Sequence, residues 1–192
     1  MTQRPLLCRP ITTETLSLIK PINDASVIGE EVVLRIGRSG FSLGYVPMGK
    51  AEWRSFPPRA CAAPDRVCQS PTSALYAALD DEDGCIGWAA VSEAENGWAE
   101  ILDLRVDAVH RRCHVATALM EMCEEFVHSR GLRGMKITVT DTNTVACQFL
   151  ENQGFALQGI DRMAFAYAPT EVDKPLARRA CALSFYRLLK KG

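Results

Sequence analysis

A strand pattern that leads through a basic turn into an amphipathic helix pattern constrains the fold of this chain more than any other feature. Apolar residues alternate with Asp103 and Arg105, which is the period-2 pattern of a strand. Residues 107–114 are too rich in charge for a buried strand, so they predict a turn. Apolar residues then recur at helical spacing from Val115, and Gly131 predicts the end of this helix.

A strand, a basic turn and a helix start in this order predict an anion-binding site. The first N–H groups of a helix have no partner within the helix, and the helix dipole adds about half a positive charge there. A pyrophosphate fits such a site. Arg111 and Arg112 would add charge-assisted hydrogen bonds to phosphate oxygens. The alternative interpretation is that both arginines only hydrate an exposed turn, and the pattern leaves it open.

A second strand and a second helix follow. Residues 134–140 predict a half-buried strand, and Asn143 is a good N-cap for a helix that ends at Gly154. Residues 56–71 contain four prolines and predict a long loop. Further strands are predicted at 27–36, 40–46, 73–79, 85–91 and 180–189. Strands and helices in this order predict a mixed α/β fold.

Size and charge limit the classes of function. With 192 residues the chain can bury about 70% of its unfolded surface in one domain. A formal net charge of −1 and the lack of a long Lys/Arg block argue against a nucleic-acid partner. Eight cysteines without a C-x-x-C pair predict reduced, buried thiols, and we expect no metal site. No apolar run is typical of a signal peptide or a membrane span, so a soluble, cytoplasmic protein is expected.

On these residues the chain resembles the GNAT superfamily of acyl-CoA-dependent N-acetyltransferases, and more narrowly the streptothricin acetyltransferases. The resemblance extends from about residue 27 to 188 and is densest between 97 and 167. It implies a central, mostly antiparallel sheet that is splayed at the acyl-CoA site and flanked by helices. It also implies one domain over 1–192 with a coenzyme-binding core at about 84–167. The segments that carry it are 39–43, 111–116, 140–143, 146–149 and 154–161.

The resemblance also implies the cosubstrate, acetyl-CoA, and a set of residues that bind it. No metal is implied. The implied coenzyme-binding residues are Leu104, Arg105, Val106, Arg111, Arg112, Cys113, His114, Val115, Ala116, Thr117, Asn143 and Cys147.

Three residues depart from the pattern of the family. His114 stands where the family has glycine, whose missing Cβ lets the backbone approach the pyrophosphate. A side chain there is tolerated if the residue has ordinary helical dihedrals and points away. Leu150 stands where the resemblance implies a tyrosine that protonates the departing thiolate. Leu102 replaces a glutamate that the streptothricin enzymes tend to carry, which leaves Asp103 as the acid in the middle of this strand.

Proton transfer therefore has several candidates. Asp103 is the candidate general base, directly or through water, and its alternative is a carboxylate paired with Arg105 or another cation. Asp141 is expected to end the strand or cap a turn, with catalysis as the alternative. Tyr167, Tyr186 or a water molecule could donate the proton that Leu150 cannot.

The expected function is acetyl transfer from acetyl-CoA to an amine of a small cationic molecule, with a streptothricin-type antibiotic as the first choice. Arg59 and Arg66 weaken the attraction for a polycation unless Glu30, Glu31 or Glu52 compensates. An aminoglycoside, a polyamine or a peptide amine are alternative acceptors, and a catalytically impaired coenzyme- or ligand-binding protein is the rival class. The expected partner is thus a small amine, with no membrane partner, and the protein is expected to be a monomer or a homodimer.

Overall fold

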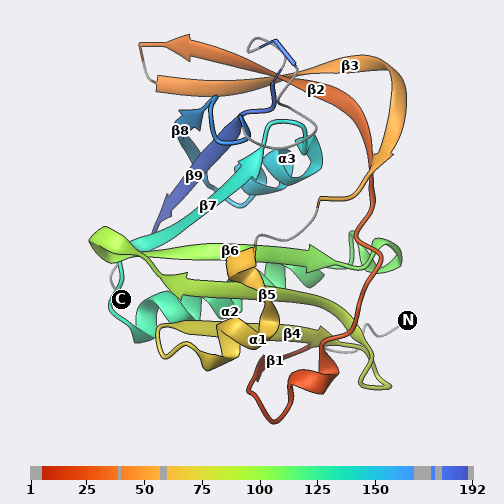
Figure 1. Cartoon of the computed structure of the whole chain (residues 1–192), viewed down its shortest axis with the longest axis vertical. Helices are drawn as coiled ribbons and strands as arrows, with labels where there is room; N and C mark the ends of the chain where they lie inside the picture. Colours follow the sequence, from red (N-terminus) through yellow and green to blue (C-terminus); the bar gives the residue numbers. More distant parts are fainter. Residues whose placement is uncertain (1–5, 39, 57–59, 167–173, 176–178, 190–192) are drawn as a thin grey trace. The chain divides into compact units, whose positions relative to one another are not determined.

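The structure is a computed structural model that describes residues 6–38, 40–56, 60–166, 174–175 and 179–189. The chain forms two compact units (Figure 1). The first unit contains residues up to Ala25, residues Ser55–Met135 and the chain from Leu188. The second contains Ser26–Arg54 and Lys136–Arg187.

The first unit is built on four strands in the order β1-β4-β5-β6. Each neighbouring pair is antiparallel. The predicted strands at 73–79 and 85–91 are confirmed as a hairpin, because β4 pairs with β5 along its length. The four strands are β1 (Leu7–Ile11), β4 (Ser73–Leu79), β5 (Cys85–Glu93) and β6 (Trp98–Val106). Short 3-10 turns lie at η1 (Leu16–Leu18), η2 (Ala60–Ala62), η3 (Glu95–Gly97) and η4 (Ala108–His110).

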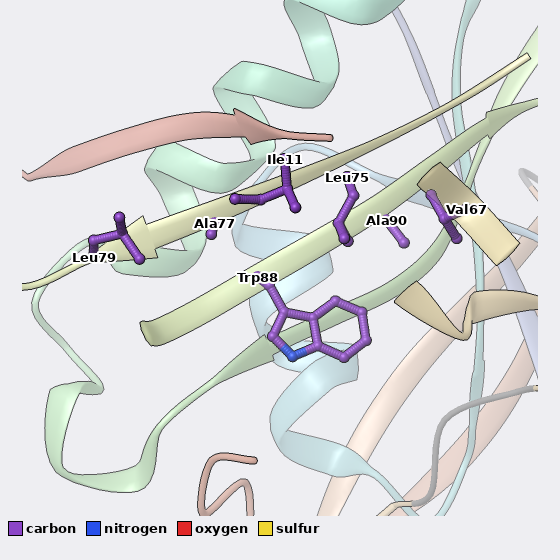
Figure 2. Packing of buried hydrophobic residues seen from close by; sticks show 7 residues of the cluster. All are labelled: Ile11, Val67, Leu75, Ala77, Leu79, Trp88 and Ala90. Atoms are coloured by element: carbon purple, nitrogen blue, oxygen red, sulfur yellow. The ribbon is translucent and has the colours of Figure 1, made fainter. Parts of the chain in front are cut away.

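Two helices, α1 (Pro64–Gln69) and α2 (Val115–Ser129), cover opposite faces of this sheet (Figure 1). On the face of α1 lies a hydrophobic cluster whose side chains Figure 2 shows. On the other face, a Cβ built on Gly87 of β5 would lie 3.0 Å from Val115 and 3.3 Å from Leu119 of α2. The cluster consists of Ile11, Val67, Leu75, Ala77, Leu79, Trp88 and Ala90.

The prediction of an irregular loop over residues 56–71 was wrong for its second half. Pro64 stands at the start of α1, where its missing N–H costs no helical hydrogen bond and its fixed φ suits the helix. Val67 then reaches the cluster and is 2% exposed. Proline here starts a short helix, whereas the sequence pattern treats it as a breaker.

The predicted start and end of the long helix are confirmed. α2 begins at Val115, and beyond its last residue Gly131 has a φ of +63°. The N–H of Leu132 donates to the carbonyl of Val127 at 3.0 Å, and the N–H of Gly131 to that of His128 at 3.1 Å. These two bonds form a Schellman motif, in which glycine takes the left-handed position without strain.

The second unit contains three strands in the order β7-β9-β8, one helix and a long hairpin. β7 and the N-cap Asn143 lie as predicted, and β8 and β9 are antiparallel. The strands at 27–36 and 40–46 are confirmed as a hairpin, and its second strand extends further than predicted, to Arg54. The elements are β2 (Ser26–Gly37), β3 (Gly40–Arg54), β7 (Gly134–Thr140), α3 (Thr144–Asn152), β8 (Ala156–Asp161) and β9 (Ala182–Leu188).

The mixed α/β class and the mostly antiparallel sheet flanked by helices are thus confirmed. All eight cysteines are free, but the prediction that the thiols are buried holds only for Cys123, Cys147 and Cys181. Cys8, Cys68 and Cys85 are half-buried, and Cys61 and Cys113 are exposed. In the described part of the chain, no helix is long and apolar enough to cross a membrane.

We expect Leu75→Ala to lower the free energy of unfolding by about 2–5 kcal/mol, because it opens a cavity in a packed cluster. Leu75 is 1% exposed. Leu7→Ala on β1 is the matched control, since this leucine is 51% exposed and should change stability by about 0.5 kcal/mol or less. Urea unfolding followed by circular dichroism measures both, and equal losses would contradict the assigned cluster.

Candidate functional site

A β-bulge lies in the middle of β6. Asp103 pairs with Ala90 of β5 and Ile101 with Val91, so Leu102 is an extra residue without its own partner. Leu102 packs against the cluster that contains Trp88 and Ala90. The strict alternation expected from the sequence therefore fails at Leu102, because a bulge shifts the period by one residue. The expectation that Asp103 and Arg105 share a face holds, and this is the face of α1.

The alternative that the sequence offered for Asp103, an ion pair with Arg105, is present. The Nε of Arg105 donates to Oδ2 of Asp103 at 2.7 Å, and the N–H of Leu104 donates to Oδ1 at 2.9 Å. The guanidinium also forms an ion pair with Asp24 and lies 5.9 Å from the centre of the Trp88 ring. Sequence reasoning missed Asp24, because it lies 81 residues away and no motif contains it.

Burial raises the pKa of the Asp103 carboxyl above its ordinary value. The hydrogen bond and the charge of Arg105 act in the opposite direction, and the charge of Asp24 adds to the increase. Asp103 is 14% exposed at its side chain. A carboxylate with a raised pKa is a stronger base than one in water, so the ion pair does not remove its capacity to accept a proton.

The backbone of the predicted anion site differs from the sequence expectation. His114, the N-cap of α2, has a φ of +61°, and so does Arg112. The condition under which a side chain at His114 would be tolerated, ordinary helical dihedrals, is therefore not met. This is a left-handed conformation that glycine adopts without a steric cost, which explains why the family pattern has glycine here. The His114 side chain is exposed and does not cap the helix.

The two arginines of the basic turn have different environments. Arg111 donates to the backbone carbonyls of Ala25 at 2.6 Å and Asp24 at 2.5 Å. Its guanidinium thus fixes the turn to the segment before β2. Arg112 is exposed, so its charge faces solvent. Both arginines were predicted to hold phosphate oxygens. The Arg111 guanidinium is engaged by two backbone carbonyls, whereas the Arg112 side chain is exposed to solvent.

The same segment also bonds to the chain between β6 and α2. The N–H of Ala108 donates to the carbonyl of Asn23 at 2.7 Å, and the N–H of Asn23 donates to Asp107 at 3.1 Å. Asp107 also accepts from the N–H of Val109 at 3.1 Å. These bonds fix the turn that precedes the start of α2.

The structure places the predicted coenzyme-binding residues in two groups. Leu104, Arg105, Val106 and residues 111–117 lie on β6 and around the start of α2, in the first unit. Asn143 and Cys147 belong to the second unit. The Asn143 side chain accepts from the N–H of Ala146 at 3.1 Å, so the predicted N-cap is confirmed.

Two side chains of α3 that the sequence singled out are buried in the core. Cys147 is 0% and Leu150 1% exposed. Leu150 is therefore a core residue of the second unit. Asp141 accepts from the N–H of Cys181 at 2.9 Å, and burial raises the pKa of its carboxyl. Asp141 directly follows the last residue of β7, Thr140, which fits the expectation that it ends the strand.

A tyrosine that sequence reasoning did not select lies beside α3. The hydroxyl of Tyr45 on β3 donates to Glu151 at 2.5 Å, and burial raises the pKa of this hydroxyl. The hydroxyl of Tyr45 thus keeps its proton and is engaged in a hydrogen bond to Glu151. Two other tyrosines were expected as proton donors. The ring centre of Tyr186 lies 6.0 Å from the Lys136 ammonium. Tyr167 lies outside the described residues.

The acidic residues that were expected to attract a cationic acceptor have different hydrogen-bond and ion-pair partners. Gln148 of α3 donates to Glu30 at 2.6 Å, and this amide donor is uncharged. Glu52 pairs with Arg54 at 2.8 Å, so its charge is offset. Among the described residues, no group of three His, Cys, Asp or Glu side chains could hold a metal ion.

The family model described as Acetyltransferase (GNAT) family matches residues 46–155, which include β6, α2, β7 and α3. The chain belongs to the GNAT acetyltransferase family. A curated relative, streptothricin acetyltransferase A of Bacillus subtilis (strain 168), is 30% identical over 89 residues, which are 46% of this chain. The match covers 51% of this relative and 55% of a second curated relative, so it spans about half of their length.

Two solved structures of acetyltransferases share the fold over nearly the whole chain. A candidate streptothricin acetyltransferase from Bacillus anthracis str. Ames, in complex with acetyl coenzyme A, has a TM-score of 0.80 at 19% identity. The alignment covers 97% of this chain and 98% of that one. Nourseothricin acetyltransferase has a TM-score of 0.77 at 22% identity, with 96% and 99% covered.

We expect His114→Gly to raise the free energy of unfolding by about 1 kcal/mol, because it removes a side chain from a left-handed position. Cys113→Gly is the matched control. Cys113 does not have a positive φ, so glycine there should only loosen the unfolded chain and lower stability. Urea unfolding of both variants gives the answer, and a loss of stability in His114→Gly would contradict the backbone described here.

We expect Arg111→Ala to lower the free energy of unfolding by about 1.5–3 kcal/mol, because it removes charged hydrogen bonds to two backbone carbonyls. Arg112→Ala should change it by about 0.5 kcal/mol or less. Thermal unfolding compares the two variants. Equal stability of both would show that the Arg111 contacts do not hold the turn.

Proposed function

We propose that this GNAT protein transfers the acetyl group of acetyl-CoA to an amine of a small cationic molecule, with a streptothricin-type antibiotic as the acceptor. The observation that carries the proposal is the 30% identity to streptothricin acetyltransferase A over 89 residues, together with the match to the GNAT family model. The shared fold with a protein crystallised with acetyl coenzyme A is consistent with this.

The start of α2 is the proposed site of the coenzyme diphosphate. The first turn of α2 offers backbone N–H groups and the positive end of a helix dipole of 15 residues. Arg112 is exposed beside it and can add a charge-assisted hydrogen bond to a phosphate. Arg111 contributes by holding the turn in place.

Asp103 is the proposed acceptor of the amine proton, directly or through a water molecule. An amine like that of lysine is neutral in only about one molecule in 2,500 at pH 7, so the reaction needs a group that takes its proton. The raised pKa of Asp103 supports this role.

The departing thiolate needs less help. A thiol like that of cysteine has a pKa near 8.5, so its thiolate leaves near neutral pH without complete protonation. Leu150 cannot supply a proton, and the Tyr45 hydroxyl donates its hydrogen bond to Glu151. Water is therefore the proposed proton source, and the enzyme should be slower than one with a positioned acid by up to about 10²- to 10⁴-fold.

A thiol-release assay with acetyl-CoA tests the function. We expect turnover with streptothricin that exceeds turnover with aminoglycosides and polyamines. Arg112→Ala should raise the KM for acetyl-CoA in a salt-dependent way, because it removes an exposed charge. Turnover at the background rate with every acceptor would contradict the proposal.

Asp103→Asn should lower kcat/KM for the acceptor by about 10²- to 10⁴-fold at pH 7 and leave the affinity for acetyl-CoA unchanged. The wild-type rate should increase with pH as Asp103 loses its proton, and the variant should lack this acidic limb. The pH profile of kcat/KM measures both. A variant with the wild-type profile would assign the base to another group.

The second candidate is a protein that binds coenzyme or an amine without efficient chemistry, which Leu150 and His114 favour. Calorimetric titration separates the two, because tight binding without acetylated product supports the second candidate. Leu150→Tyr is a less simple rescue than the sequence suggests. Leu150 is buried, so a larger side chain should cost about 1–3 kcal/mol of stability before it can donate a proton.

A further inference from the structure

Arg105 contacts three separate stretches of the first unit through its three guanidinium nitrogens. Nε donates to Asp103 on its own strand, at 2.7 Å. Nη1 donates to Asp24, two residues before β2 begins. Nη2 donates to the carbonyl of Phe56, at 2.7 Å, two residues after β3 ends. One side chain thus joins β6 to the chain that enters and leaves the β2–β3 hairpin.

The guanidinium and the two carboxyl groups that bind it are largely buried, and the two acids outnumber the single arginine. The side chains of Arg105, Asp103 and Asp24 are 13%, 14% and 18% exposed. Asp24 also accepts from the Ser55 hydroxyl at 2.6 Å. Arginine keeps its proton in proteins, so two ionised carboxylates around it leave a net charge of −1. Such a group favours the uptake of one proton.

We infer that Arg105 and Asp24 are positioning residues for Asp103, and the inference rests on the proposed role of Asp103 as the base. Arg105 and the Leu104 N–H each hold one oxygen of the carboxyl group, which fixes its orientation on β6. Asp24 binds the same guanidinium and so weakens its effect on Asp103. The pair therefore sets how readily Asp103 accepts a proton.

The residues of β5 opposite Asp103 and Arg105 carry no charge. The cross-strand partner of Asp103 is Ala90, and Trp88 lies opposite Arg105 on β5. The short turn η2 contacts β6 and has the sequence Ala-Cys-Ala. The charged groups that shift the pKa of the Asp103 carboxyl include Arg105, which lowers it, and Asp24, which raises it.

Two substitutions should shift the pH profile in opposite directions. Asp24→Asn leaves the guanidinium to Asp103 alone, so the carboxyl group loses its proton more easily and the acidic limb of kcat/KM moves to lower pH. Arg105→Gln removes the positive charge, so the limb moves to higher pH. At pH 7, kcat/KM for the acceptor should then fall about tenfold or more. A purely structural role would lower both rates without opposite shifts.

Two further variants serve as controls. Asp65→Asn removes a carboxylate from the exposed surface of α1 and should leave the limb in place. Arg105→Lys keeps the charge without the planar fork and should lie between wild type and Arg105→Gln. It also stands in for Arg105→Gln if circular dichroism shows that the glutamine variant is unfolded.

Carbon-13 NMR of the Asp103 carboxyl separates this inference from the proposed function, because the titration needs no turnover. Opposite displacements of its midpoint in Asp24→Asn and Arg105→Lys support the inference even if no acceptor is acetylated. Turnover of streptothricin with no displacement of this midpoint would overturn it and leave the proposed function intact. Displacements in the same direction would also overturn it.

Discussion

The contacts of one guanidinium organise the candidate site. Arg105 is held over Trp88 and bonds to two carboxylates and a carbonyl, so β6 and two distant stretches of chain share one fixed point. A buried arginine is stable only where its charge and donors are satisfied, so these stretches must lie beside it once the unit folds. The position of Asp103 and the order of the turn before α2 both depend on this arrangement.

Local sequence patterns predicted much of the fold because they act within a few residues. The strand at 134–140, the cap at Asn143 and the helix end at Gly131 each follow from one periodicity or one turn residue. The short helix α1 was not predicted, because a proline is compatible both with a break in a helix and with the first position of one. The bulge at Leu102 was not predicted either, since only the pairing with β5 shows which residue of β6 has no partner.

The candidate site was harder to predict than the fold. Sequence placed Asp103 and Arg105 on one face, but the partner Asp24 depends on tertiary contacts that no spacing shows. The family pattern identified the loop before α2, while the positive φ of His114 and the use of Arg111 against backbone carbonyls became visible only in three dimensions. Similar side chains in one motif, Arg111 and Arg112, therefore have different tasks.

The bulge also determines where β6 can tolerate a change in length. Without Leu102, Ile101 and Asp103 would become neighbours in a regular ladder and keep their present partners Val91 and Ala90. Loss of a residue between Asp103 and Arg105 would instead turn these two side chains to opposite faces. Insertions and deletions among homologues should therefore gather at Leu102 and be absent from the two residues that follow Asp103.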